Sequence, residues 1–182
     1  MFIGIIFFVL LSGAGHYYNT FDYNNIDSYF NDFIGENNEN SPDDKEFYRT
    51  ENKNQWNSSM VSDNKDIICW NSTVSSSIFS FYENVGAGRY VTSSPDDSLY
   101  GLRALLSVKY IYNKDNEWLN TKLYSSDNVN TIYENVDFLP MGFGYDNYIS
   151  ESEYQALPVE NRHLVLLKAL VLSDEDVQKY NS

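Results

Sequence analysis

The sequence predicts an α+β fold, an antiparallel strand-rich domain with several short helices. Short alternating runs separated by turn residues are typical of antiparallel strands, and they occur as "TKLYS" at 121–125, "VNTIYEN" at 129–135 and "MGFGY" at 141–145. Apolar residues at helical spacing occupy 72–85 and 159–172 instead. Because strands and helices are grouped and do not alternate, we expect a meander of strands and not an array of β-α-β units.

The composition indicates a folded domain with an acidic surface. Hydrophobic residues make up 42% of the 182 residues and aromatic residues 16%, which is too apolar for an intrinsically disordered chain. The net charge is -14, and Lys plus Arg total 12. The charge argues against nucleic acid and anionic lipid headgroups as partners, because both require a basic surface. Sugars, cations and basic proteins stay open.

The apolar run "FIGIIFFVLL" at 2–11 predicts a membrane or signal-like segment over residues 1–15. About 13 residues fit in hydrocarbon, whereas a spanning helix needs roughly 20. A signal peptide would use the small residues "SGA" at 12–14 for cleavage, but a basic start is missing. The alternative is the outer end of a membrane helix that begins before this chain. Both interpretations place the following residues on the extracytoplasmic side, and a buried terminal element of a soluble protein is the third alternative.

Residues 16–45 are predicted to form a polar linker with a short helix near 22–34, and residues 46–182 an extracytoplasmic domain. The linker ends in the loop sequence "GENNENSPDDKE" at 35–46. In the domain, "EFYRTEN" at 46–52 begins as a strand, and "DIICW" at 66–70 has strand character.

Two helices are expected before the central strands. The first covers 72–85, with Ser72 as its N-cap and Gly86 as the left-handed residue that ends it. The second is entered through Pro95 and the pair Asp96-Asp97, whose charges suit a helix N-terminus. It runs directly into the strand "VKYIY" at 108–112.

The C-terminal part is predicted to begin with strands and to end in helices. In 131–148, a strand is followed by a turn at Leu139-Pro140 and then by a strand around Phe143, where the flanking glycines allow a bulge. Ser150 and Glu153 form a capping-box pattern that begins a helix, and a further helix is expected over 159–172.

The sequence predicts no catalytic residue, no metal site and no cofactor. Cys69 lies in an apolar run and is expected to be an inert core residue, since a single cysteine forms no internal disulfide. His163 is expected on a solvated helix face. "VGAGRY" at 85–90 lacks the residues of a phosphate-binding loop and is interpreted as a helix end and a turn.

Five residues are candidates for ligand binding. Arg49 and Arg103 lie beside apolar or aromatic residues, so each is expected either to pair with a carboxylate as a structural clamp or to bind a sugar phosphate. Tyr133, Asn135 and Tyr145 would provide aromatic faces and hydrogen bonds to a sugar.

Several segments, in this order, resemble one family. They are "EFYRTEN" at 46, "NSTVSSSIFSFYENVG" at 71, "LRALLSVKYIYNKD" at 102, "IYENVDFLPMGFGYDNYISESEY" at 132 and "LLKALVLSDED" at 166. Together they are similar to the C-terminal extracytoplasmic region of the YfhO-type bacterial membrane proteins, over most of residues 45–176. The resemblance implies a polytopic protein of the GT-C glycosyltransferase class, which decorates envelope polymers such as lipoteichoic acid from a lipid-linked donor. It carries no catalytic residue onto this chain, which looks like a fragment.

The resemblance implies a location at the cell membrane, on its extracytoplasmic face. The expected partners are the protein's own membrane helices and a cell-wall glycopolymer or lipid-linked sugar, with no nucleic acid. The expected role is accessory, either acceptor binding or scaffolding, and the alternative is a secreted or surface carbohydrate-binding module with a cleaved signal peptide. For a polyanionic acceptor, divalent cations or a basic patch of Lys109, Arg103 and Arg89 would have to offset the acidic surface.

Overall fold

The computed structural model describes residues 42–60, 62–113, 120–127 and 130–181. The apolar segment 1–15 and the helix expected near 22–34 lie outside the described residues. The described part combines helices with largely antiparallel sheets, which confirms the α+β class. Among its helices, none has both the length and the apolar character needed to cross a bilayer.

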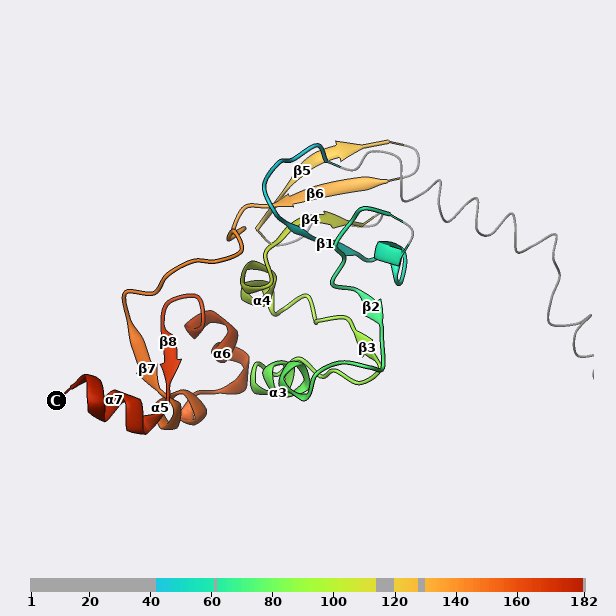
Figure 1. The fold of residues 1–182 in the computed structure, drawn as a ribbon. Coiled ribbons are helices and arrows are strands. Elements are labelled where there is room, and N and C mark those ends of the chain that lie inside the picture. The colour runs from blue at the N-terminus through green and yellow to red at the C-terminus, as the bar shows by residue number, and fades with distance from the viewer. Residues whose placement is uncertain (1–41, 61, 114–119, 128–129, 182) are drawn as a thin grey trace, which may run out of the picture. The chain divides into compact units, whose positions relative to one another are not determined.

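The largest sheet has four strands, in the order β1-β4-β6-β5 (Figure 1). The strands are β1 (Arg49–Asn52), β4 (Val108–Tyr112), β5 (Thr121–Ser126) and β6 (Thr131–Asn135). β6 pairs antiparallel with both β4 and β5, and it therefore lies between two strands that precede it in the sequence. The expected meander is wrong in this respect. β1 joins β4 in parallel, a pairing that the local patterns do not reveal.

The sheet buries side chains on both faces. Val108 and Ile111 pack with Ile67 and Ile68, whereas a second cluster is made by Tyr110, Tyr112 and Ile132. β4 is central, so four of its five side chains are buried. The edge strand β5 is mostly exposed, as expected for a strand paired on one side only.

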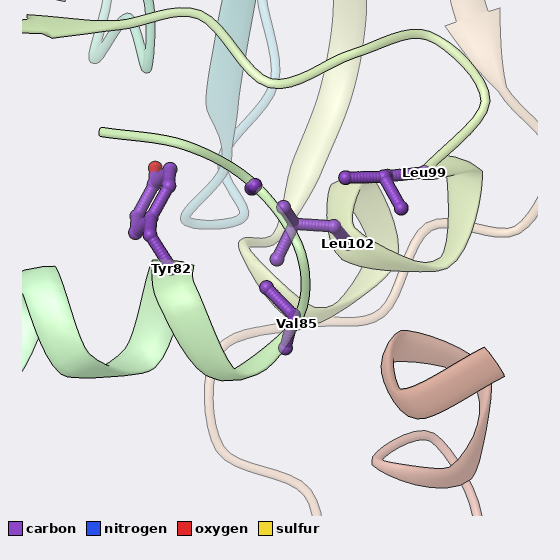
Figure 2. Packing of buried hydrophobic residues seen from close by; sticks show 5 residues of the cluster. Tyr82, Val85, Leu99 and Leu102 are labelled. Carbon is purple, nitrogen blue, oxygen red and sulfur yellow. The ribbon is translucent and has the colours of Figure 1, made fainter. Parts of the chain in front are cut away.

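Helix α3 (Ser76–Asn84) covers a third cluster together with α4 (Tyr100–Leu105). Figure 2 shows Tyr82 and Val85 projecting from the α3 segment beside Leu99 and Leu102 of the α4 segment. The predicted end of the helix is confirmed, because Gly86 has φ +76°. A side chain there would be strained, and its Cβ would lie 2.4 Å from Cγ1 of Val159.

The starts of both helices differ from the prediction. α3 is capped by Ser75 and not by Ser72, because residues 71–73 are held by a turn at Asn71. α4 has no acidic residue in its first turn. Asp97 lies before the helix and pairs with Arg103 and Lys53.

Two short strands, β2 (Cys69–Trp70) and β3 (Thr92–Ser93), pair antiparallel and connect the sheet region with α3. A 3-10 turn, η1 (Ser58–Met60), precedes β2. The strand expected at 66–70 is thus confirmed over its second half, and Asp66 itself forms an isolated parallel bridge with Thr50.

The C-terminal part contains a parallel strand pair that the sequence did not predict. β7 (Tyr148–Ser150) pairs with β8 (Leu170–Leu172), and the connection between them contains α5 (Glu151–Ala156) and α6 (Val159–Val165). The helix expected over 159–172 therefore ends early, in turns closed by the carbonyls of Leu164 and Val165. A last helix, α7 (Asp174–Tyr180), follows β8.

The strand expected at 141–145 is also wrong. Gly142 has φ +87°, which interrupts an extended conformation. The strand begins later, at Tyr148. By contrast, the capping box of Ser150 and Glu153 at the start of α5 is confirmed.

His163 is buried, with 2% of its surface exposed, so its expected place on a solvated face is wrong. It lies between α6 and α4, with its ring edge-on to Tyr100 at 5.7 Å. Gly101 permits this approach, because a Cβ on it would lie 2.7 Å from Cδ2 of His163. Because Gly101 has no side chain, the imidazole of His163 fits against α4.

Candidate functional site

The candidate site is an open cavity of about 400 Å³ that lies against α3. The apolar side of α3, which the helical spacing of its residues predicted, forms one wall. Only part of that face reaches the core: Tyr82 is buried, but Ile78 is 39% exposed. The apolar lining residues are Ile67, Val74, Ile78, Phe81, Tyr82 and Leu106. The charged ones are Arg49, Asp66 and Arg89, so we name it the Arg49–Arg89 cavity.

Arg49 comes from the first position of β1 and is half-buried. One Nη donates a hydrogen bond of 2.9 Å to the carbonyl oxygen of Leu106. The guanidinium also lies over the ring of Phe47, 5.5 Å from its centroid. No carboxylate among the described residues pairs with it, so its positive charge is held in place without being neutralised.

Arg89 lies in the loop after α3 and is 9% exposed. Its Nη groups donate long hydrogen bonds to backbone carbonyls, 3.3 Å to Tyr90 and 3.4 Å to Asn71. The guanidinium lies 5.4 Å from the centroid of the Phe79 ring. Within the described part of the chain it also has no carboxylate partner. The cavity therefore contains a second positive charge that is not neutralised.

Asp66 is the acidic residue of the cavity. Its Oδ1 accepts from the backbone N–H groups of Asn52 and Ile68, both at 3.0 Å, and its Oδ2 accepts from Ser58 Oγ at 2.7 Å. Burial raises the pKa of this carboxyl from 3.8 to about 6, against the effect of those donors. The carboxylate thus bonds to the end of β1, to η1 and to Ile68, and it forms no ion pair with either arginine.

Tyr82 and Cys69 complete the cavity. The Tyr82 hydroxyl lies 3.1 Å from Ser93 Oγ, and burial raises its pKa, while the charges of Arg89 and Arg49 act in the opposite direction. Both arginines therefore influence the same hydroxyl group. Cys69 is a free, half-buried thiol on the cavity wall, not a fully buried core residue as expected.

The arrangement is suited to binding an anion beside an apolar surface. Two guanidinium groups offer N–H donors and positive charge, and the α3 wall offers contact area. In the parts of the chain that the structure describes, no three His, Cys, Asp or Glu side chains gather as a metal site requires.

The family model described as bacterial membrane protein YfhO matches residues 3–182. The chain belongs to the YfhO family. This confirms the resemblance seen in the ordered segments between residues 45 and 176, and it extends over nearly the whole sequence. No curated protein and no solved structure matches the chain.

In this YfhO chain, the two arginines expected to act alike have different surroundings. Arg103 is buried and pairs with Glu51 and Asp97, so it is the predicted structural clamp. Arg49 lines the cavity. The basic patch of Lys109, Arg103 and Arg89, one of the two ways to accommodate a polyanionic acceptor, does not form, because Lys109 pairs with Asp44 and Glu46 and Arg103 is buried.

The three other candidate residues of the YfhO chain lie apart from the Arg49–Arg89 cavity. Tyr133 packs against the cluster of Ile67, Ile68, Val108 and Ile111. Asn135 is buried and donates to the Val108 carbonyl at 2.9 Å while accepting from the Asp137 N–H at 3.1 Å. Tyr145 donates to the Leu166 carbonyl at 2.6 Å and lines a smaller cavity beside Tyr148 and Tyr180. The structure therefore does not gather the three in one site.

Of the charged cavity residues, the sequence did not point to Asp66, and it pointed to Arg89 only as part of the basic patch that a polyanionic acceptor would need. Arg89 stands in a glycine-containing turn, and Asp66 precedes a short apolar run. The available signal for Arg89 was an arginine five residues after the end of α3, in a stretch, 84–95, that contains no acidic residue.

Proposed function

We propose that this chain forms the extracytoplasmic domain of a polytopic bacterial membrane protein that resembles a cell-envelope glycosyltransferase of the lipoteichoic acid type. Its role is accessory: it binds the acceptor and holds it near the enzyme's catalytic part. The family membership supports a membrane protein. The observation that carries the binding role is the Arg49–Arg89 cavity, where two arginines that pair with no carboxylate of the described residues line one apolar-walled space.

The cavity is suited to holding a ligand and not to transforming it. Asp66, the carboxylate among its described lining residues, already accepts three hydrogen bonds from Asn52, Ser58 and Ile68. Its tyrosine hydroxyl has a raised pKa and bonds to Ser93. The described groups thus offer charge, donors and contact area, which position a ligand for chemistry performed elsewhere.

The test uses the full-length membrane protein. Replacing Arg49 and Arg89 together with Gln is expected to reduce sugar transfer to the acceptor polymer when acceptor is limiting, with the same amount of protein in the membrane. Lys122→Gln is the matched control, because Lys122 is 62% exposed and pairs on the sheet with Glu134. Unchanged transfer in the double variant would remove the acceptor-binding role.

A scaffolding role is the second candidate, and exposed aromatic residues favour it. Trp56 and Trp70 are 48% and 66% exposed, and Met60 is 79% exposed. Asn57 holds these segments together, since it accepts from the Trp70 N–H at 2.7 Å and from the Met60 N–H at 3.0 Å. Such side chains suit packing against the protein's own membrane helices or the interfacial layer of a bilayer.

Replacing Trp56 and Trp70 with Gln tests this second role. If these residues pack on the membrane part, the double variant is cleaved faster by protease in membranes, while the isolated chain keeps its thermal midpoint. Equal protease resistance of variant and wild type in membranes would count against scaffolding. For the alternative of a secreted module, N-terminal sequencing of the mature protein would find Gly15 first.

A further inference from the structure

Arg49 is half-buried and Arg89 is buried, and neither forms an ion pair with a carboxylate of the described residues. Arginine keeps its charge in proteins, and buried charges are normally paired. Arg103 and Lys109 follow this rule, with carboxylates within 3.5 Å. Arg49 and Arg89 contact carbonyl oxygens and ring faces, and Asp66, which lines the same cavity, forms no ion pair with either of them in the described structure.

Arg162 shows how an arginine without a carboxylate is satisfied structurally. Its Nε and both Nη donate to the carbonyls of Leu157, Asn84 and Gln155 at 2.8–3.3 Å. All three lie at or near helix C-termini, where carbonyls carry partial negative charge. Arg162 therefore uses all its nitrogens on backbone acceptors.

The two cavity arginines do not use all their N–H donors in hydrogen bonds within the described structure. Arg49 forms one hydrogen bond, through one Nη, and Arg89 forms two bonds that are longer than the usual 2.9–3.0 Å. Each guanidinium also lies over an aromatic ring, 5.5 Å from the Phe47 centroid for Arg49 and 5.4 Å from the Phe79 centroid for Arg89. Planar groups with unused N–H donors and restricted motion bind an anion at low entropic cost.

We propose that the Arg49–Arg89 cavity binds the phosphoryl group of an anionic ligand, with the apolar α3 wall contacting the part of the ligand attached to it. A phosphoryl group has enough oxygens to accept from two guanidinium groups that come from different segments. A carboxylate typically binds one guanidinium with both of its oxygens. The cavity volume of about 400 Å³ leaves room for more than the phosphoryl group itself. This inference rests on the proposed function, because it names the chemical group that the same cavity binds.

Asp66 is expected to lower the affinity of the cavity for an anion. It is the only carboxylate among the described lining residues, so it opposes the binding of an anion. Replacing it with Asn keeps an oxygen for the N–H groups of Asn52 and Ile68 and removes the negative charge. Asp66→Asn is therefore expected to bind a phosphoryl anion more tightly than the wild type.

The test is calorimetric titration of the 182-residue chain with three probes: inorganic phosphate, a short oligomer of glycerol phosphate, and geranyl phosphate. All contain the phosphoryl group, and glycerol and acetate serve as the neutral and carboxylate controls. We expect the phosphoryl probes to bind and the affinity to fall with added salt. Stronger binding of the oligomer assigns a phosphodiester polymer, and stronger binding of geranyl phosphate assigns a lipid-linked phosphate; either result supports the site.

Variants locate the binding. Arg49→Gln and Arg89→Gln are each expected to weaken binding about tenfold or more, as loss of a charged hydrogen-bonding partner does. Lys122→Gln and Arg162→Gln are expected to leave it unchanged. Circular dichroism confirms that each variant is folded, and Arg89→Lys, which keeps the charge, provides a second measurement if Arg89→Gln does not fold.

Three results would overturn the inference: no binding of any phosphoryl probe, equal binding of glycerol, or affinity that neither arginine variant changes. Failure here is distinct from failure of the proposed function. Reduced sugar transfer in the arginine double variant without phosphoryl binding would leave the acceptor role and remove the phosphoryl ligand. Phosphoryl binding by the wild type together with unchanged sugar transfer in the double variant would keep the phosphoryl ligand and remove the acceptor role.

Discussion

Glu51 on β1 and Arg103 on α4 form a buried ion pair that joins the sheet to the helix. The Arg103 Nε lies 2.5 Å from Oε2 of Glu51, and the two side chains are 6% and 1% exposed. Lys53 and Asp97 surround the pair, each within 3.0 Å of one member. The resulting cluster balances two positive and two negative charges inside an acidic protein.

Arg103→Met is expected to lower the free energy of unfolding by about 3 kcal/mol, because it leaves Glu51 buried without its closest partner. The double variant Glu51→Leu/Arg103→Met is expected to recover most of that loss, since Lys53 and Asp97 lie 2.9 Å apart and stay paired. Urea unfolding measures both. Lys122→Met, at an exposed pair, is the control and should cost less than about 1 kcal/mol. A loss for Arg103→Met no larger than that of the control would contradict the prediction.

Asp66 is expected to make the protein less stable as pH rises. Its folded pKa of about 6 lies above the ordinary 3.8, so the folded state holds the proton more tightly than the unfolded chain does. The stabilising contribution is complete below about pH 3.8 and is lost as pH rises through about 6. Asp66→Asn lacks this dependence.

Relative to wild type, Asp66→Asn should therefore gain up to about 3 kcal/mol of unfolding free energy between pH 4 and pH 7.5. Urea unfolding of both proteins at several pH values in this window measures the difference. Because both proteins share every other titrating group, their difference isolates Asp66. Stability curves that stay parallel over the whole window would show that burial does not perturb this carboxyl.

Gly101→Ala is expected to separate α4 from α6 and to cost about 1–3 kcal/mol. The added Cβ would lie 2.7 Å from His163 Cδ2 and 3.0 Å from Leu164 Cδ2. Gly144→Ala is the matched control, because nothing lies within 4 Å of its Cβ position. Thermal unfolding compares the two, and similar midpoints would mean that the helices shift without cost.

His163 is expected to act on stability in the opposite direction from Asp66. Burial lowers the pKa of its imidazole below 6.5, so the unfolded chain binds the proton more readily. Its contribution is present above about pH 6.5 and is lost as pH falls through the lowered folded pKa. Neither ring nitrogen has a hydrogen-bond partner in the described structure.

His163→Leu should accordingly be about as stable as wild type at pH 7.5 and more stable than wild type toward pH 5. The thermal midpoints of the two proteins across this range provide the measurement. A constant difference between them would indicate that His163 does not titrate differently in the folded state. In the double variant His163→Leu/Asp66→Asn, both pH-dependent contributions to stability are removed, so comparison with each single variant separates them.

Local sequence patterns predicted the elements whose determinants lie within a few residues. The capping box of Ser150 and Glu153 needs only a hydroxyl and a carboxylate three positions apart, and it formed. Gly86 ended α3 because only glycine takes that conformation without strain. The strand at 108–112 follows from its own β-branched and aromatic residues. The family resemblance, too, depends on the order of segments and was confirmed.

The partners of each element came from contacts between distant parts of the chain. The apolar spacing around Leu170 predicts a helix, but its backbone pairs with Tyr148 in a parallel strand pair. Similarly, β6 lies between β4 and β5, an arrangement that strand patterns alone do not determine. Pairing of this kind depends on which backbone edges meet, and propensity does not encode that.

The sequence by itself determined an acidic α+β domain of the YfhO family and the elements whose signals are local, such as the capping box at Ser150, the strand at 108–112 and the glycine end of α3. Only the tertiary structure decided that Arg103 is a clamp and that Arg49 lines a cavity with Arg89. The physical reason is that an arginine's role depends on the charge nearest to it. For Arg103 that charge is Glu51, 52 positions away. For Arg49 and Arg89, no described carboxylate occupies that place.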